Sequence, residues 1–474
     1  VVVVYRIYLQ QMLDIKWRSW LTAKFIKRWL DKNVYYLLES KKTNTDNPDQ
    51  RIAEDLKYFS DSTISLAMGI LNATVTLLSF IGILWMLSGE LTFNLVGKNI
   101  TIEGYMVWIA IVYALLGSYL TNKIGKPLVK LNFEQQKFEA NYRFNLIRVR
   151  EQSEGIALYK GEDIEEKNLF KSFSDIISNW WELMKYQKRL MWFTSGYGQL
   201  AIIFPFVVAS PRYFSGAIAL GALMQISSSF GKVQDSLSWF IENYARLATW
   251  KASLDRLVTF SDSMHNSSNV STGINLSKDS NTLKIESLSL NKPSGETISD
   301  YEPITINESD KILVKGPSGT GKSTLFKAIA GIWPFGKGNI SVPKDSFFIP
   351  QKSYLPIDSL YNVINYPSPP KTYTREQVIN YMQLCDLSHI VKDLDQITHW
   401  EKRLSPGEQQ RISFVRLLLR KPKWVFLDEA TSSLDEETQA KLYKVINEIL
   451  PSSTVISIAH RKSLEDFHSK IIAL

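Results

Sequence analysis

Long apolar stretches without charge dominate the first half of the chain, whereas the second half alternates short apolar runs with polar ones. Residues 64–87 contain no charged side chain, and a helix over them is long enough to cross a hydrocarbon core of about 30 Å. Residues 105–121 and 191–210 are also uncharged, and residues 216–230 form a fourth, weaker stretch with small residues spaced for close helix packing. The pattern predicts four membrane spans.

The apolar residues 1–9 have two interpretations, a buried β-strand or part of a membrane helix. We favour the helix because uncharged spans follow. An aromatic stripe with Lys and Arg between its members comes next, and it fits an interfacial helix or a packed helix elbow equally well. Its members are Trp17, Trp20, Leu21, Phe25 and Trp29.

Basic residues gather in two polar segments, 16–42 and 123–189, whereas segments 88–104 and 210–215 carry few. Because basic loops stay in the cytoplasm, the first two segments are predicted to face the cytoplasm and the other two the outside. This arrangement accounts for the formal net charge of +8. Binding of nucleic acid would need the Lys and Arg residues on one soluble face, so we expect a lipid bilayer and no nucleic acid as partner.

The cytoplasmic segment 125–188 alternates apolar and charged residues at helical spacing. It predicts that two membrane helices continue far into the cytoplasm and meet at a turn near Lys160, Gly161 and Glu162. Polar residues inside the spans favour hydrogen bonds between helices, and lining of a substrate path is the alternative. They are Asn72, Thr74, Thr76, Gln199, Gln225 and Ser227 to Ser229.

Composition supports this division of the chain. Hydrophobic residues at 45% and aromatic residues at 12% exclude a disordered polar chain and fit membrane-interface belts. The single cysteine, Cys385, excludes an intrachain disulfide and is interpreted as a buried structural thiol. The aperiodic Ser- and Asn-rich segment 261–280 predicts a linker. We therefore expect a membrane domain over 1–260 and an α/β domain over 281–474.

A phosphate-binding loop begins the chemistry of the second domain. The apolar run Lys311–Lys315 predicts a strand, Gly316–Ser323 follows, and a helix is expected from Thr324. This is the G-x-x-x-x-G-K-[ST] pattern in its strand–loop–helix context, in which backbone N–H groups surround phosphates. Lys322 would reach the β- and γ-phosphates and Ser323 would bind Mg²⁺. The predicted nucleotide-binding residues are Gly316, Pro317, Ser318, Gly319, Thr320, Gly321, Lys322, Ser323 and Thr324.

Two carboxylates end another apolar strand, Trp424–Asp428. Asp428 can hold the metal, and Glu429 beside it can act as base toward an attacking water. A strand followed by an acidic helix start would be the ordinary interpretation. Together with the phosphate-binding loop, the pair predicts hydrolysis of ATP with Mg²⁺ as cofactor.

Four further motifs resemble those of the ATPase domain of ABC transporters, and they occur in that family's order. Leu404–Arg411 (LSPGEQQR) resembles the signature, Gln351 the Q-loop glutamine, Ser433–Asp435 the D-loop and His460 the switch histidine. The resemblance implies an α-helical transmembrane domain of ABC exporter type followed by an α/β P-loop ATPase domain. It also implies site residues: ATP contacts from Ser405, Gly407, Glu408 and Asp435, catalytic roles for Glu429, His460, Lys322 and Gln351, and metal ligands Ser323, Gln351 and Asp428.

The membrane half resembles one branch of ABC half-transporters through Asn47–Arg51 (NPDQR) and residues 133–162. That branch includes bacterial vitamin B12/bleomycin and SbmA/BacA-type peptide uptake transporters and, more distantly, peroxisomal acyl-CoA transporters. The resemblance implies a homodimer, because one signature acts on the nucleotide of the opposing loop. It also implies a bacterial inner membrane location with the ATPase domain in the cytoplasm, and further membrane helix before Val1, six helices in all.

The branch implies uptake of bulky hydrophilic or amphiphilic solutes such as cobalamin or peptides. Export of lipids, acyl-CoA or drugs is an alternative that an apolar, Arg-lined cavity would favour. An ATP-gated channel or regulator is another, although Glu429 and His460 are both present. Two departures from the family pattern stand out: Pro406 replaces a signature glycine, and Lys292 lies where an aromatic residue usually stacks on adenine.

Overall fold

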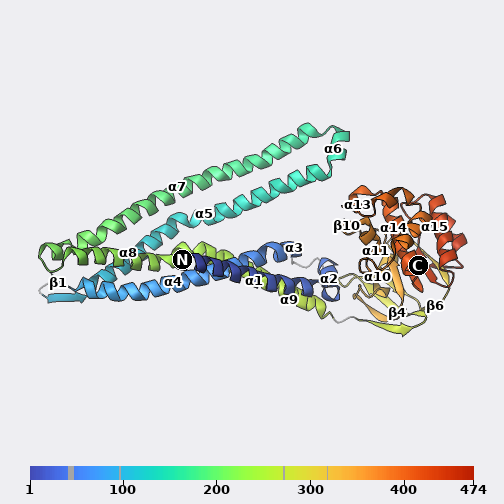
Figure 1. Ribbon diagram of the computed structural model, residues 1–474, viewed down its shortest axis with the longest axis horizontal. Helices are drawn as coiled ribbons and strands as arrows, with labels where there is room; N and C mark the ends of the chain where they lie inside the picture. The colour runs from blue at the N-terminus through green and yellow to red at the C-terminus, as the bar shows by residue number, and fades with distance from the viewer. Residues whose placement is uncertain (41–46, 96–97, 271–272, 318) are drawn as a thin grey trace. The chain divides into compact units, whose positions relative to one another are not determined.

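The computed structural model describes residues 1–474 except 41–46, 96–97, 271–272 and 318. The chain divides into two compact units (Figure 1). The first contains residues 1–25 and 47–260, and the second contains residues 26–46 and 261–474.

The first unit is built from long helices and one hairpin. The hairpin pairs β1 (Glu90–Leu95) with β2 (Lys98–Glu103). Its helical segments are α1 (Val2–Leu30), α3 (Pro48–Gln50), the π-helical turn η2 (Arg51–Asp55), α4 (Leu56–Ser88), α5 (Tyr105–Glu151), α6 (Ser153–Tyr159), α7 (Glu162–Phe214), α8 (Leu220–Glu242) and α9 (Tyr244–Ser268). Residues 26–30 of α1 and 261–268 of α9 belong to the second unit.

Helix α1 contains residues 2–9 and the aromatic stripe, so this segment is helical and not a β-strand. The stripe packs: the Trp17 ring lies 5.4 Å from that of Phe59, and Phe25 lies 6.0 Å from Phe260. The helix ends before Lys32 and Asn33, whose positive φ angles do not continue an α-helix.

Three described helical segments are long and apolar enough to cross a membrane, namely residues 48–88, α5 and α7. They contain the stretches 64–87, 105–121 and 191–210. Helix α8 forms at the fourth, weaker stretch but begins at Leu220 rather than at residue 216, and it is not one of these three.

Helices α4, α5, α7 and α8 surround an apolar cluster that includes Leu84, Met106, Ile226 and Phe230. Beside it, the rings of Tyr113 and Tyr197 stack 4.4 Å apart, and each hydroxyl donates to the other residue's backbone carbonyl. Gly117 permits this approach, because a Cβ there would lie 2.1 Å from the Tyr197 ring. A small residue thus sets how closely α5 and α7 approach.

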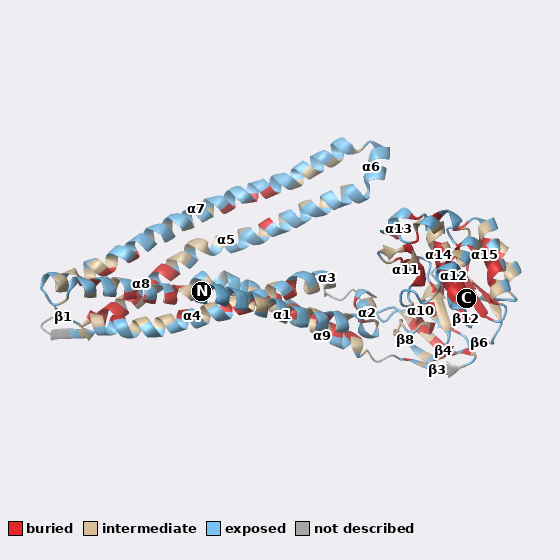
Figure 2. Cartoon of the chain, in the orientation of Figure 1, coloured by how far each residue is buried: buried red, intermediate tan, exposed pale blue. Residues whose placement is uncertain are grey.

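Beyond this cluster α5 and α7 continue side by side to α6 (Figure 1). Asn179 of α7 donates to the Gln135 side chain (2.8 Å) and to the Leu131 carbonyl (3.0 Å) of α5. Most of this region is exposed (Figure 2). The predicted turn is confirmed, since Lys160 adopts a left-handed conformation and α7 begins at Glu162.

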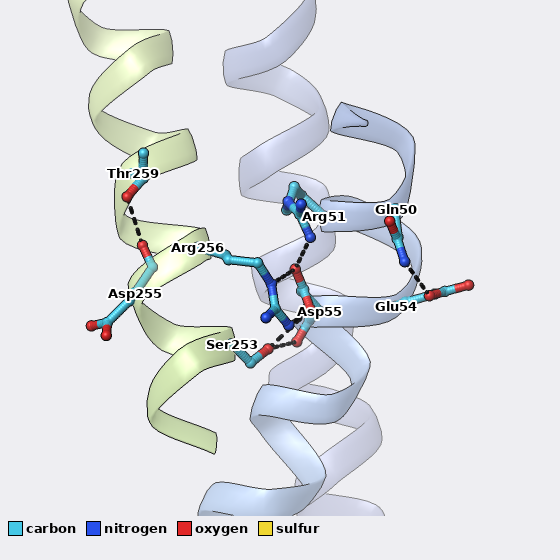
Figure 3. Close-up of polar contacts among 8 residues, drawn as sticks. All are labelled: Gln50, Arg51, Glu54, Asp55, Ser253, Asp255, Arg256 and Thr259. Carbon is cyan, nitrogen blue, oxygen red and sulfur yellow. Dashed lines mark hydrogen bonds and ion pairs between the residues drawn. The ribbon is translucent and has the colours of Figure 1, made fainter. Parts of the chain in front are cut away.

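A buried carboxylate joins α9 to the start of α4 (Figure 3). Asp55 accepts from Arg51 Nη1 at 2.7 Å, from Arg256 Nε at 3.0 Å and Nη2 at 2.6 Å, and from Ser253 Oγ at 3.1 Å. We call these four residues the Asp55 cluster. One and two helical turns further along α4, Phe59 stacks on Trp250 and Thr63 accepts from the Trp250 indole N–H at 2.7 Å.

The second unit contains a five-stranded parallel sheet whose strands are apolar along most of their length, as burial on both faces requires. Neighbours pair in the order β14 (Lys470–Ala473), β7 (Lys311–Lys315), β13 (Thr454–Ile458), β12 (Trp424–Asp428) and β9 (Ser346–Ile349). Asp428 is opposite Ile458, and Ile458 is opposite Val314. The carboxyl ends of β7, β12 and β13 therefore share one edge.

A second sheet contains β3 (Ile274–Ser280), β8 (Gly336–Pro343), β4 (Leu283–Asn291), β5 (Thr297–Tyr301) and β6 (Ile304–Ile306). The predicted linker over 261–280 is therefore wrong. Its first part completes α9 and its last part forms β3. Met264 and Ile274 are buried in these elements. Because they are far apart in the sequence and their neighbours are polar, no apolar periodicity indicates a helix or a strand there.

Helices and short segments complete this unit. They are η1 (Asp31–Asn33), α2 (Val34–Ser40), α10 (Lys322–Ile329), β10 (Asp358–Ser359), α11 (Leu360–Asn365), α12 (Arg375–Leu384), η3 (Ser388–Asp393), β11 (Ile397–Thr398), α13 (Trp400–Arg403), α14 (Pro406–Arg420), α15 (Glu436–Ile449) and η4 (Lys462–Phe467). Buried residues concentrate here (Figure 2). Cys385 is among them, and burial raises the pKa of its thiol to about 12.

Candidate functional site

The phosphate-binding loop connects β7 to α10 at the carboxyl edge of the parallel sheet. Helix α10 begins at Lys322, two residues earlier than predicted, because Gly321 takes the preceding position with a φ of 87°. A Cβ at Gly321 would lie 2.7 Å from the Tyr301 hydroxyl, so only glycine fits. The N–H groups at a helix start of this kind are suited to an anion.

The Lys322 ammonium holds the loop in its curved shape. Its Nζ donates to the carbonyls of Gly316 (2.9 Å) and Pro317 (2.6 Å), and the Thr320 hydroxyl also donates to the Pro317 carbonyl, at 3.0 Å. Thr324 lies in the first turn of α10. Ser318, another predicted contact, lies outside the described residues.

Ser323 and Asp428 meet between α10 and the end of β12, where Ser323 Oγ donates to Asp428 Oδ1 at 2.9 Å. Burial raises the pKa of Asp428, and the bond from Ser323 only partly offsets that effect. A hydroxyl and a carboxylate are oxygen ligands of the kind that Mg²⁺ prefers. No group of three His, Cys, Asp or Glu side chains gathers around a metal position among the described residues, so further ligands would come from phosphate and water.

Glu429 lies between two of the predicted residues. Gln351 Nε2 donates to its Oε2 at 2.7 Å, and His460 Nε2 lies 3.4 Å from its Oε1. Glu429 has a φ of 47°, a left-handed conformation that costs a non-glycine residue free energy and recurs at functional sites. The structure therefore brings Gln351, Glu429 and His460 together, with Gln351 on Glu429 rather than on Ser323 or Asp428.

The signature segment forms the start of α14. Ser405 caps this helix: its Oγ accepts from the Glu408 N–H at 3.3 Å, and Glu408 Oε2 accepts from the Ser405 N–H and hydroxyl, each at 2.8 Å. Pro406 takes the first helical position, where its missing N–H leaves no intrahelical bond unmade. Among the described residues, no hydrogen bond or ion pair joins Ser405, Gly407 or Glu408 to the phosphate-binding loop of the same chain.

Asp435 caps α15, where it accepts from the Thr438 N–H at 2.7 Å and hydroxyl at 2.9 Å, and these bonds lower the pKa of Asp435. Arg461 was not predicted from the sequence. It donates to the carbonyls of Leu434 (2.6 Å) and Ser432 (3.2 Å) and so holds the segment before Asp435. Arg461 directly follows His460 in the sequence, and this position next to a predicted site residue could have indicated its role.

Gln410 was missed in the same way. It donates to Ser432 Oγ at 3.1 Å and accepts from the Ser433 N–H at 3.0 Å, so it ties the signature helix to the segment before Asp435.

Lys292 lies in the β4–β5 turn, where its ammonium pairs with Glu296 at 2.8 Å. Its charge is thus already engaged by a neighbouring carboxylate.

Comparison with known proteins decides the family. The sequence matches the family ABC transporter transmembrane region 2 over residues 1–214 and the family ABC transporter over residues 303–432. It is 35% identical, over 96% of this chain and 80% of the relative, to the inner membrane ABC transporter ATP-binding protein YddA of Escherichia coli. This chain belongs to the ABC transporter family.

As an ABC half-transporter, it joins one transmembrane region to one ATPase domain, which implies ATP binding and dimerisation. It is a multi-pass membrane protein and an ATPase coupled to transport. The predicted fold class is confirmed by a bacterial Atm1-family ABC exporter with ATP bound, which shares the fold at a TM-score of 0.70 over 96% of this chain and 81% of that one. At 17% identity that likeness concerns the fold alone.

A more distant relative has a named substrate. The human lysosomal cobalamin transporter ABCD4 is 26% identical over 98% of this chain and 80% of the relative.

Proposed function

We propose that two copies of this ABC half-transporter form a homodimer in a bacterial inner membrane, with the ATPase domain in the cytoplasm, and use ATP and Mg²⁺ to take up bulky hydrophilic or amphiphilic solutes. Cobalamin-like compounds and peptides are the substrate classes, and the SbmA/BacA-like branch is the placement. The observation that carries the ATP-driven part is the arrangement of Gln351, Glu429 and His460 beside the Ser323–Asp428 pair. The name of ABCD4 supports cobalamin, and that of YddA supports the inner membrane.

The residues divide the work by chemistry. The N–H groups of the loop and the Lys322 ammonium neutralise phosphate charge, and Lys322 must exchange its two carbonyl partners for phosphate oxygens. Bound Mg²⁺ would neutralise charge between the phosphates, and Ser323 and Asp428 would hold it, with Gln351 as a third ligand. For that role the Gln351 side chain must leave Glu429.

The Glu429 carboxylate is the proposed base for the attacking water, because Oε2 becomes free to accept a proton once Gln351 leaves it for the metal, while His460 lies beside Oε1. His460 would then contact the γ-phosphate. Ser405, Gly407 and Glu408 would act on the nucleotide of the second copy, and Asp435 would couple the two sites. The separation of the signature from the loop within one chain supports this assignment.

A second candidate function rests on an open groove of about 390 Å³ between α1 and α4. Its wall combines the guanidinium of Arg6 and the amides of Gln10 and Asn72 with apolar side chains such as Leu71 and Val75. An arginine beside the uncharged stretch of α4 is costly unless it faces a cavity or a partner. A wall of this kind suits an amphiphilic anion, which favours export of lipid or acyl-CoA as the alternative.

Transport in proteoliposomes tests both candidates. With ATP enclosed in the vesicles, only chains whose ATPase domain faces the lumen are active, so uptake appears as accumulation of labelled cobalamin. With ATP outside, accumulation of labelled acyl-CoA would instead report export. Glu429→Gln is the control in both arrangements. We expect accumulation with enclosed ATP that is lost in the variant. ATP hydrolysis without accumulation of cobalamin or of labelled peptides in either arrangement would contradict the uptake proposal.

A further inference from the structure

The Glu408 carboxylate has a second partner outside the signature segment. His389 Nε2 lies 2.6 Å from Glu408 Oε1, while Oε2 is occupied by Ser405. His389 belongs to η3, which is anchored by the buried side chains of Ile390 and Leu394. One carboxylate thus joins the signature segment to a separate, fixed element.

The protonation states follow from the environment. Burial alone would raise the pKa of Glu408, but the hydrogen bonds from Ser405 and His389 outweigh it, and the net pKa is lowered. Glu408 is therefore ionised at neutral pH, and an ionised carboxylate can only accept. His389 must carry its proton on Nε2 and donate it to Glu408.

The Ser405 hydroxyl has two competing acceptors. It has one hydrogen, which it now donates to Glu408 Oε2. A phosphate oxygen bound at this helix start would need the same hydrogen, and the negative charge of Glu408 would oppose the phosphate. A donor on Oε1 reduces both problems, because it draws negative charge toward the far oxygen and fixes the carboxylate in one orientation.

We propose that His389 is a positioning residue for this reaction, which holds Glu408 so that Ser405 can turn its hydroxyl to the γ-phosphate on the second copy. The inference rests on the proposed function of the signature segment. His389 touches no nucleotide itself. Its effect is confined to steps in which a γ-phosphate meets Ser405.

The test compares ATPase kinetics of the full-length protein carrying His389→Ala and His389→Gln. We expect His389→Ala to raise the apparent KM for ATP about five-fold, the effect of losing one half-exposed charged contact, with kcat nearly unchanged at saturating ATP. His389→Gln should restore the KM, because its amide N–H can donate to the same oxygen. ADP affinity, measured by calorimetry, should be unchanged because ADP has no γ-phosphate.

His399→Ala is the matched control. His399 is exposed in the same region, and among the described residues its side chain has no hydrogen bond or ion pair. A wild-type KM in His389→Ala would overturn the inference, as would failure of His389→Gln to restore it or an equal loss of ADP affinity. Ser405→Ala distinguishes a failure of the proposed function of the signature segment from a failure of the inference about His389. Normal kinetics in Ser405→Ala would overturn the proposed role of the signature segment, whereas impaired Ser405→Ala with normal His389→Ala would overturn only the role of His389.

Discussion

Two carboxylates in this chain, Asp55 and Glu429, have similar chemistry and opposite surroundings. Asp55 accepts four hydrogen bonds from three side chains, and its own side chain is 8% exposed (Figure 3). Glu429 contacts two side chains, is 27% exposed and has a left-handed backbone. A saturated carboxylate fixes structure, because no lone pair remains for a ligand. An unsaturated one at a strained position keeps the capacity to act on a substrate.

The largest expected effect follows from the unsaturated site. Glu429→Gln keeps the shape but cannot take a proton from water, so we expect ATP turnover to fall by about 100-fold or more while ATP binding remains. Phosphate release measures turnover, and retention of labelled ATP measures binding. Wild-type turnover in this variant would remove Glu429 as the base.

Substitution of the saturated carboxylate, Asp55, should instead change the stability of the protein. Asp55→Ala leaves Arg51 and Arg256 without their shared partner, and we expect a loss of about 2–3 kcal/mol, seen as a lower unfolding temperature in detergent. Asp61→Ala, in the helix α4 that follows Asp55 directly, is the matched control, because Asp61 and Arg246 are 3.9 Å apart and both exposed. Equal effects of the two substitutions would contradict the importance of burial.

Asp428 lies between these extremes, since it is half-buried beside Ser323. Its raised pKa means that the folded chain disfavours the charged form, so the cost to stability is present above the folded pKa and disappears as the pH falls toward the unfolded value. Without nucleotide or metal, Asp428→Asn should therefore raise the unfolding temperature by about 2–4 °C at neutral pH. The gain should shrink as the pH is lowered toward the unfolded pKa of the carboxyl group. A gain independent of pH would contradict this explanation.

The smallest effect is expected at an exposed pair. Arg375 and Asp395 form a bidentate contact with distances of 2.9 and 2.7 Å, but both side chains are more than half exposed. Arg375→Ala should change stability by less than about 0.5 kcal/mol, because water replaces the contact at little cost. A loss as large as that in Asp55→Ala would show that hydrogen-bond geometry, rather than burial, sets the value of these pairs.

Local patterns predicted much of this molecule because they report local physics. An uncharged run such as 64–87 is compatible with few structures other than a long helix. An apolar strand followed by the pattern of Gly316–Ser323 is specific enough to predict a phosphate-binding loop. The structure of segment 261–280 and the hydrogen-bond partners of the site residues were harder to predict from the sequence. Met264 and Ile274 are buried, but the residues around them in the sequence are polar, and the prediction of a linker was therefore wrong. Arg461, Gln410 and His389 act through contacts with distant residues, and no spacing along the sequence encodes those distances.

Cys385 has a practical consequence. It is the single cysteine of the chain, it is fully buried, and its high pKa keeps the thiol protonated. A maleimide or nitroxide reagent needs an accessible thiolate, so the natural chain should label very slowly. Within residues 1–474, one cysteine introduced on α6, or one on η3, would then carry the probe alone, without removal of a native residue. This part of the chain is already a background for fluorescence and spin-label spectroscopy.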